Sequence, residues 1–163
     1  MSVMERNTRA TASVLDRLFD AHPDQMRDRP ESPSETVANL RAAVRRDVEN
    51  LLNARRPWRS LTGAALQISP MGFGISDFTA GAFNDSHERE ALRQEIEEAI
   101  QRFEPRLAQV QVQLAENFSP LRATLALRIN ALLMVDPLPE TIGFETLVDT
   151  TTADVMLRPI EGV

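Results

Sequence analysis

The sequence predicts an α+β fold: a single domain in which helices pack on one face of an antiparallel sheet of three to four strands. Apolar residues recur every three or four positions over 34–52 and 86–103, which indicates amphipathic helices. They alternate with polar residues over 107–114 and 121–135, which indicates strands with one buried face. The period changes at Pro105, so a helix leads directly into the sheet there.

Length and composition limit the kind of protein. The chain has 163 residues, no cysteine and a formal net charge of −6. We expect a flexible segment with a short helix over 1–33, and one α+β domain over 34–163 that buries its core without disulfides. The absence of a secretory signal and of a long apolar run predicts a cytoplasmic protein without membrane insertion. The negative charge argues against nucleic acid as a partner.

The first long helix carries an apolar stripe and a charged face that is rich in arginine. The stripe consists of Val37, Leu40, Val44, Val48, Leu51 and Leu52. All 18 basic residues of the chain are arginines, and a cluster of them lies on this helix and just beyond it, at Arg41, Arg45, Arg46, Arg55, Arg56 and Arg59. We predict a positive patch for a protein partner, because the planar guanidinium suits interfaces. Pairing with Asp47 and Glu49 is the alternative.

The second long helix is followed by a charged corner. Asp85 or Ser86 can cap its start, and Pro105 ends it because proline lacks an amide hydrogen. Glu104 and Arg106 lie two positions apart in an extended segment, so their side chains should point to the same side. Charges beside a core need partners. Either the two residues pair with each other, or they meet a partner protein.

The remaining strands follow from apolar alternation and from breaks in it. The strand at 121–135 is the longest and should be central, and apolar Leu132 and Met134 on its second face predict cover on both sides near its end. A proline-rich break at 136–139 precedes a third strand around 142–148. A short fourth strand is expected at 155–157.

The outer strands of such a sheet offer free backbone groups to another chain. A strand at the edge of a sheet leaves donors and acceptors unpaired, and these can bind an added strand. The candidates are the strand at 107–114 and the terminal segment at 150–158, which contains Val155, Met156 and Leu157. We favour the terminal strand as the edge that meets a partner.

No residue pattern indicates catalysis, a metal or a cofactor. His22 and His87 each lack a neighbouring His or Cys that would complete a metal site. The glycines at Gly72 and Gly74 lack the rest of a phosphate-binding motif. We therefore predict a protein that is not an enzyme and binds no cofactor.

Two stretches resemble a known family. The sequence Leu40-Arg41, followed at 44–56 by Val-Arg-Arg-Asp-Val-Glu-Asn-Leu-Leu-Asn-Ala-Arg-Arg, is similar to a signature that ends in Leu-Leu-Asn-x-Arg-Arg. The sequence at 103–107 contains Glu-Pro-Arg. Both resemble the baseplate-wedge (TssE) family of contractile injection machines over about 14–155. The family's Tyr-Gly-Leu-Pro-Asp run reads Phe-Gly-Ile-Ser-Asp at 73–77, without its proline.

The resemblance implies a structural baseplate subunit of a bacterial type VI secretion system. Such a subunit links the wedge proteins TssF, TssG and TssK to the contractile sheath of TssB and TssC, and it starts sheath polymerisation. The resemblance places Glu104, Pro105 and Arg106 at the wedge core and a sheet edge at the sheath. Two alternatives share the fold: a baseplate protein of another phage-like contractile particle, and a regulatory anti-adaptor that binds a response regulator.

Overall fold

A computed structural model describes residues 33–56, 64–78, 85–115, 124–136, 138–149 and 151–160. The helical elements in these residues are α2 (Pro33–Asn53), α3 (Ala64–Gln67), η1 (Pro70–Gly72) and α4 (Ser86–Phe103). The strands are β1 (Arg55–Arg56), β2 (Ile75–Ser76), β3 (Leu107–Leu114), β4 (Thr124–Leu133), β5 (Glu140–Asp149) and β6 (Val155–Pro159). The short helix predicted near Ser13, and with it the predicted boundary at residue 33, depends on residues outside the described ranges.

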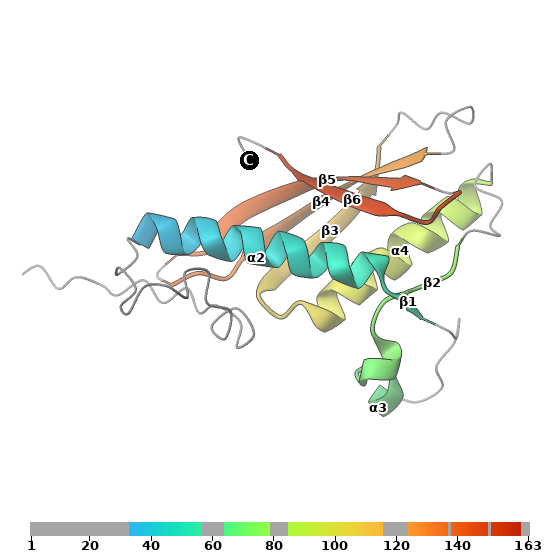
Figure 1. The fold of residues 1–163 in the computed structure, drawn as a ribbon, viewed down its shortest axis with the longest axis horizontal. Coiled ribbons are helices and arrows are strands. Elements are labelled where there is room, and N and C mark those ends of the chain that lie inside the picture. The colour runs from blue at the N-terminus through green and yellow to red at the C-terminus, as the bar shows by residue number, and fades with distance from the viewer. Residues whose placement is uncertain are drawn as a thin grey trace, which may run out of the picture.

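The main sheet is an antiparallel meander with the two long helices on the same side. Its order is β3-β4-β5-β6, so each strand pairs with its neighbour in the sequence. Figure 1 shows α2 and α4 packed beneath this sheet, with β6 running beside α2. This arrangement confirms the predicted α+β fold. A second, two-stranded sheet joins β1 and β2 in parallel.

The core lies between the sheet and the two helices, as the apolar periods predict. Val44, Val48 and Leu52 of α2 and Ile96 and Ile100 of α4 are fully buried. The sheet contributes alternate residues of each strand to the same cluster: Val110, Val112, Leu125, Leu127, Ile129, Ala131, Leu133, Ile142, Phe144, Val148, Val155 and Leu157. Thr146 of β5 is the one buried polar residue on this face in the described strands.

A bulge in β3 differs from the uniform alternation that the sequence predicts from Ala108 onwards. The pairing of β3 with β4 shifts between Ala108 and Gln111, and Gln109 has a φ of 50°. One extra residue changes the phase of the strand. As a result both Leu107 and Val110 reach the core, and Ala108 points to the other face.

The prediction of cover on both faces near the end of β4 is wrong. Met134 is 53% exposed, and Leu132 is only half-buried. The physical reason is that both long helices pack against the same face of the sheet (Figure 1). The apolar run at this point marks a partly exposed face of the sheet rather than a second core.

Candidate functional site

The Glu104-Pro105-Arg106 corner forms where α4 ends and β3 begins. Glu104 closes the helix, because its amide donates to the carbonyl oxygen of Ile100 at 2.9 Å and Pro105 cannot extend the ladder. Its side chain is buried and accepts hydrogen bonds from Arg106 Nε at 2.6 Å and Nη2 at 2.5 Å. The pairing of Glu104 with Arg106 inside the chain, one of the two predicted alternatives, is therefore present.

Arg106 also binds Asp47 of α2, a contact that the sequence analysis missed. Arg106 Nη2 lies 2.6 Å from Asp47 Oδ2. The hydrogen bond to Glu104 raises the pKa of Arg106, burial opposes this rise, and the hydrogen bond to Asp47 adds to it. The guanidinium thus stays charged and ties the corner to α2. Asp47 lies three residues after Val44 and four before Leu51, at the border of the apolar stripe, and this position was the available signal.

A hollow opens beside this ion cluster. It has a volume of about 450 Å³ and is lined by Asp47, Asn50, Leu51, Phe73, Phe103, Glu104, Pro105 and Arg106. Arg106 belongs to this lining, and its Nη1 is buried and has no hydrogen-bond partner among the described residues. A buried donor without an acceptor is costly. The residue that lines the hollow beside its apolar walls therefore has one guanidinium nitrogen whose hydrogen-bonding capacity is unused.

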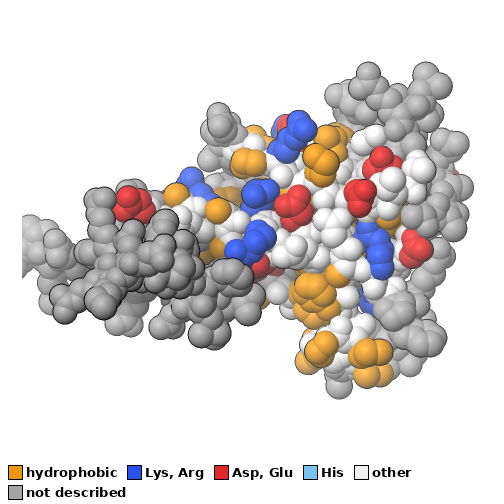
Figure 2. Space-filling model, viewed as in Figure 1, with side chains coloured by type: hydrophobic (Ala, Val, Ile, Leu, Met, Phe, Trp, Pro, Cys, Tyr) orange, Lys and Arg blue, Asp and Glu red, His pale blue; other side chains and the backbone are white. Residues whose placement is uncertain are grey.

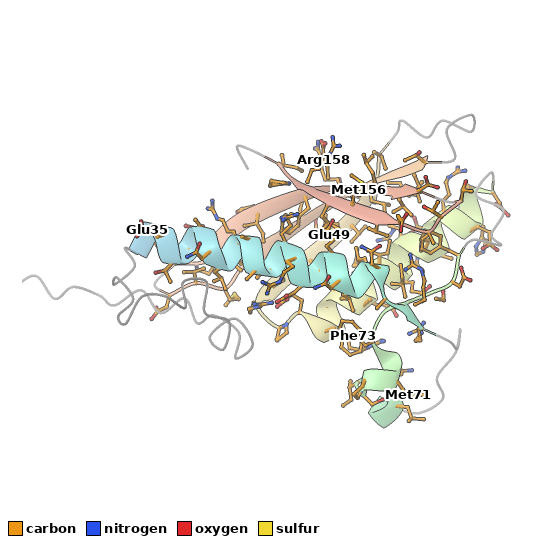
Figure 3. The ribbon with its side chains drawn as sticks, viewed as in Figure 1. Glu35, Glu49, Met71, Phe73, Met156 and Arg158 are labelled. Atoms are coloured by element: carbon orange, nitrogen blue, oxygen red, sulfur yellow. The ribbon has the colours of Figure 1, made fainter. Side chains whose placement is uncertain are left out.

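Exposed apolar side chains continue the hollow onto the surface. Phe73 is 41% exposed and meets Phe103 edge to face, with 5.4 Å between ring centroids. Leu66, Ile68 and Met71 are also exposed. Figure 2 shows apolar side chains gathered at the end of the molecule formed by α3 and η1, and Figure 3 places Phe73 near the end of α4 with Met71 further out. We call Leu66, Ile68, Met71 and Phe73 the apolar rim.

The loop that carries the apolar rim is anchored by Gly74, which the family's usual run also has, and by Ser76, which stands in place of that run's proline. Gly74 has a φ of +99°, and a Cβ there would lie 2.4 Å from the carbonyl oxygen of Ala54, so only glycine fits. Ser76 donates its amide to Glu95 Oε1 at 2.7 Å. A proline at this position would remove that donor. The serine that stands in place of the family's proline therefore makes a backbone hydrogen bond that a proline could not make.

The predicted arginine patch divides into an exposed part and an internal part. The side chains of Arg41, Arg45 and Arg46 are 53%, 38% and 49% exposed. Arg45 pairs with Glu49 and Arg46 with Asp47, which is the predicted alternative of pairing within the helix. Arg41 instead reaches Glu140 of β5 at 2.5 Å, an ion pair between distant parts of the chain.

Arg55 and Arg56 are used inside the domain. Arg55 donates to the carbonyl oxygens of Leu52 and Ala153 and lies over the ring of Phe78, and its burial lowers its pKa. Arg56 pairs with Glu95 at 2.7 Å and its side chain is 11% exposed. These contacts give both arginines a role within the domain, whereas the side chains of Arg41, Arg45 and Arg46 are more than one third exposed. Arg59 lies outside the described ranges.

The expectation of free backbone groups on the terminal strand is wrong. Strand β6 does lie at the edge of the sheet, and Met156 is 51% exposed. However, the carboxamide of Asn53 accepts from the amide of Val155 and donates to its carbonyl oxygen, both at 2.9 Å. The amide and carbonyl groups of Leu157 face Glu49 at 3.4 Å and Arg45 at 3.5 Å. The cause is α2, whose side chains run along this edge.

Two further features are absent from the described segments. Within those segments, no three or more His, Cys, Asp or Glu residues form a group that could hold a metal ion. None of the helices described is long and apolar enough to cross a membrane.

Comparison with known proteins identifies the family. A sequence model described as "Baseplate wedge protein gp25" matches residues 38–138, which is more than half of the 163 residues. The match contains both the α2 signature and the corner at Glu104, Pro105 and Arg106, and it ends before β5. No curated protein and no solved structure matches the chain. The chain belongs to the family of the baseplate wedge protein gp25, which is also the family of TssE.

Proposed function

We propose that this protein is a structural baseplate subunit of a bacterial type VI secretion system. In this role it acts in the cytoplasm, joins the wedge proteins TssF, TssG and TssK to the sheath subunits TssB and TssC, and starts sheath polymerisation. Its family and the two signatures that resemble TssE support the assignment. The role is one of binding rather than catalysis, so we expect protein surfaces to carry the function.

The observation that carries the proposal is the hollow at the Glu104-Pro105-Arg106 corner. Glu104 and Asp47 fix the Arg106 guanidinium in place, so its orientation needs no further ordering when a partner binds. The unused Nη1 donor requires an acceptor. Two carboxylates already outnumber the one guanidinium, so a further anion would be repelled, which favours a neutral acceptor such as a backbone carbonyl at the end of a partner helix.

The apolar rim supplies the second half of the proposed contact. Leu66, Ile68, Met71 and Phe73 expose large apolar side chains, and Phe73 also lines the hollow. Aromatic and methionine side chains are enriched at interface centres, and burying them there stabilises a complex. We assign this end of the molecule to the wedge proteins, with an apolar partner side chain in the hollow and a partner carbonyl on Arg106.

The test fills the hollow without disturbing the ion cluster. Asn50 is exposed, lines the hollow and has no place in the Arg106 cluster, so Asn50→Trp should block the hollow and leave the fold intact. We expect copurification with TssF, TssG and TssK to fall by about tenfold or more. Ala42→Trp, at an exposed position of the same helix that does not line the hollow, is the matched control and should bind as wild type does.

A folded Asn50→Trp variant that retains normal wedge binding contradicts the assignment of the hollow. Circular dichroism and a urea unfolding curve establish whether the variant is folded. If both tryptophan variants lose binding, the exposed side of α2 contacts the wedge instead of the corner.

A further inference from the structure

Side chains of α2 cover the outer edge of β6 in the manner of a neighbouring strand. A carboxamide has the same donor and acceptor as a peptide group, and Asn53 uses both on Val155. Glu49 and Arg45, which pair with each other, act together as the next acceptor and donor, at Leu157. Figure 3 shows Glu49 on the side of α2 that borders β6. We call Arg45, Glu49 and Asn53 the α2 stripe.

The other edge of the sheet is covered in the same way by α4. Glu97 accepts from the amide of Val112 at 3.0 Å, and Arg93 donates to the carbonyl oxygen of Val112 at 3.1 Å. Gln101 donates to the carbonyl oxygen of Val110 at 3.3 Å. We call Arg93, Glu97 and Gln101 the α4 stripe.

The two stripes share one sequence pattern: arginine, then glutamate four residues later, then asparagine or glutamine after four more. The spacing has a geometric reason. Four residues of a helix rise about 6 Å, whereas two residues of a strand span about 6.6 Å, so every fourth side chain of a helix stays in step with every second residue of a strand. Each helix therefore binds several outward backbone groups of an edge that would otherwise recruit other strands.

The α2 stripe and the α4 stripe differ in the lengths of their contacts to the strands and in how exposed their side chains are. At β6 only Asn53 makes short hydrogen bonds, while the contacts of Glu49 and Arg45 to Leu157 are 3.4 Å and 3.5 Å long. The side chains of Arg45 and Glu49 are 38% and 29% exposed, and their mutual distance is 3.3 Å. In the α4 stripe, the Arg93 side chain is 18% exposed and lies 2.8 Å from Glu97. The Arg45–Glu49 part of the α2 stripe is thus the looser cover, although Asn53 lies closer to β6 than Gln101, at 3.3 Å, lies to β3.

We propose that the α2 stripe is a removable seal on β6. An extended segment of the sheath subunit displaces Arg45, Glu49 and Asn53 and binds the backbone of Val155 and Leu157 in their place, while the α4 stripe keeps β3 closed. The sheath subunit as occupant rests on the proposed function. The seal itself rests on the contacts of the two stripes. The seal lets a strand bind β6 only if that strand displaces the side chains of the α2 stripe. At other times the seal protects β6 from unspecific pairing.

The first test measures amide hydrogen exchange by NMR in the full-length protein. In wild type, the Leu157 amide should exchange about tenfold faster than the Val112 amide, because its contact to Glu49 is longer than that of Val112 to Glu97. The double variant Glu49→Ala, Asn53→Ala should speed the exchange of Val155 and Leu157 about tenfold. The matched variant Glu97→Ala, Gln101→Ala should do so only for Val112. Slower exchange at Leu157 than at Val112 in wild type overturns the proposal.

The second test counts fluorescent sheaths in cells, with deletion of the gene as reference. Deletion should abolish sheath starts, and a deletion strain with normal sheaths contradicts the proposed function whatever the exchange data show. The Glu49→Ala, Asn53→Ala variant should increase starts, since opening the edge no longer costs those hydrogen bonds. The Glu97→Ala, Gln101→Ala variant should leave the frequency unchanged. Fewer starts with the α2-stripe variant, at normal wedge binding, show that the side chains rather than the edge contact the sheath and refute the seal.

Discussion

Arg106 binds the carboxylates of Asp47 and Glu104. Removal of its side chain leaves the negative charge of the buried Glu104 without a partner. In Arg106→Ala the Glu104 side chain, which is 5% exposed, loses its partner. Breaking a buried ion pair on one side costs about 3 kcal/mol, so we expect the free energy of unfolding to fall by this amount. Urea denaturation followed by circular dichroism measures the change.

The double variant with Glu104→Gln separates the ion pair from packing. Neutralising Glu104 removes the uncompensated charge, so the two substitutions together should cost clearly less than the sum of the single ones. Additive losses contradict the coupling. Because Arg106→Ala weakens the domain itself, the Asn50→Trp variant is the cleaner probe of partner binding.

Sequence spacing predicted part of this cluster. Glu104 and Arg106 do pair, but they do so across a turn in which the Leu107 amide donates to the Glu104 carbonyl oxygen at 3.1 Å, and not along the extended segment that the sequence predicted. The contact with Asp47 was not predictable in the same way, because it depends on how α2 packs against the corner, 59 residues away in the sequence. The position of Asp47 at the border of an apolar stripe is typical of a side chain that turns toward the core, but it does not indicate which residue the side chain will contact.

At the scale of elements, strand β5 contains a buried hydroxyl group that makes no hydrogen bond to the described residues and so does not stabilise the fold. Thr146 is fully buried, and its Oγ1 has no hydrogen-bond partner among the described residues. Thr146→Val keeps the shape and the β-branch and removes the unsatisfied group, so the free energy of unfolding should rise by about 1 kcal/mol.

Thr146→Ser is the control for this substitution, because it keeps the hydroxyl and loses a methyl group. It should lower the free energy of unfolding by about 1 kcal/mol. Both changes are read from urea midpoints. A less stable Thr146→Val variant indicates that the hydroxyl has a partner and contradicts the account of β5.

The spacing of apolar residues predicted the helices and strands themselves better than the irregularities within them and the contacts of the outer strands. The change from helical to alternating spacing at Pro105 located the end of α4 and the start of β3. The bulge near Gln109 was not predicted. Apolar and glutamine residues alternate throughout this segment, and the alternation does not show where one residue is left unpaired. Nor was the cover of the outer strands, since it requires knowing which face of each helix lies along which edge.

At the scale of the whole molecule, α2 belongs to both proposed contact regions. Asp47 and Asn50 lie at the hollow of the corner, whereas Glu49 and Asn53 lie along β6. At 3.6 residues per turn the two pairs are centred about 110° apart around the helix axis, so one helix serves both regions. The family signature in α2 therefore coincides with the part of the chain that connects the proposed wedge site with the proposed sheath edge.

The most direct measurement is a cryo-electron microscopy structure of the assembled baseplate that contains this protein. The account predicts that a wedge protein occupies the hollow beside Phe73 and Phe103, with an acceptor atom within hydrogen-bond distance of Arg106 Nη1. A baseplate in which the Glu104-Pro105-Arg106 corner faces solvent, while the wedge proteins bind elsewhere on the domain, contradicts it.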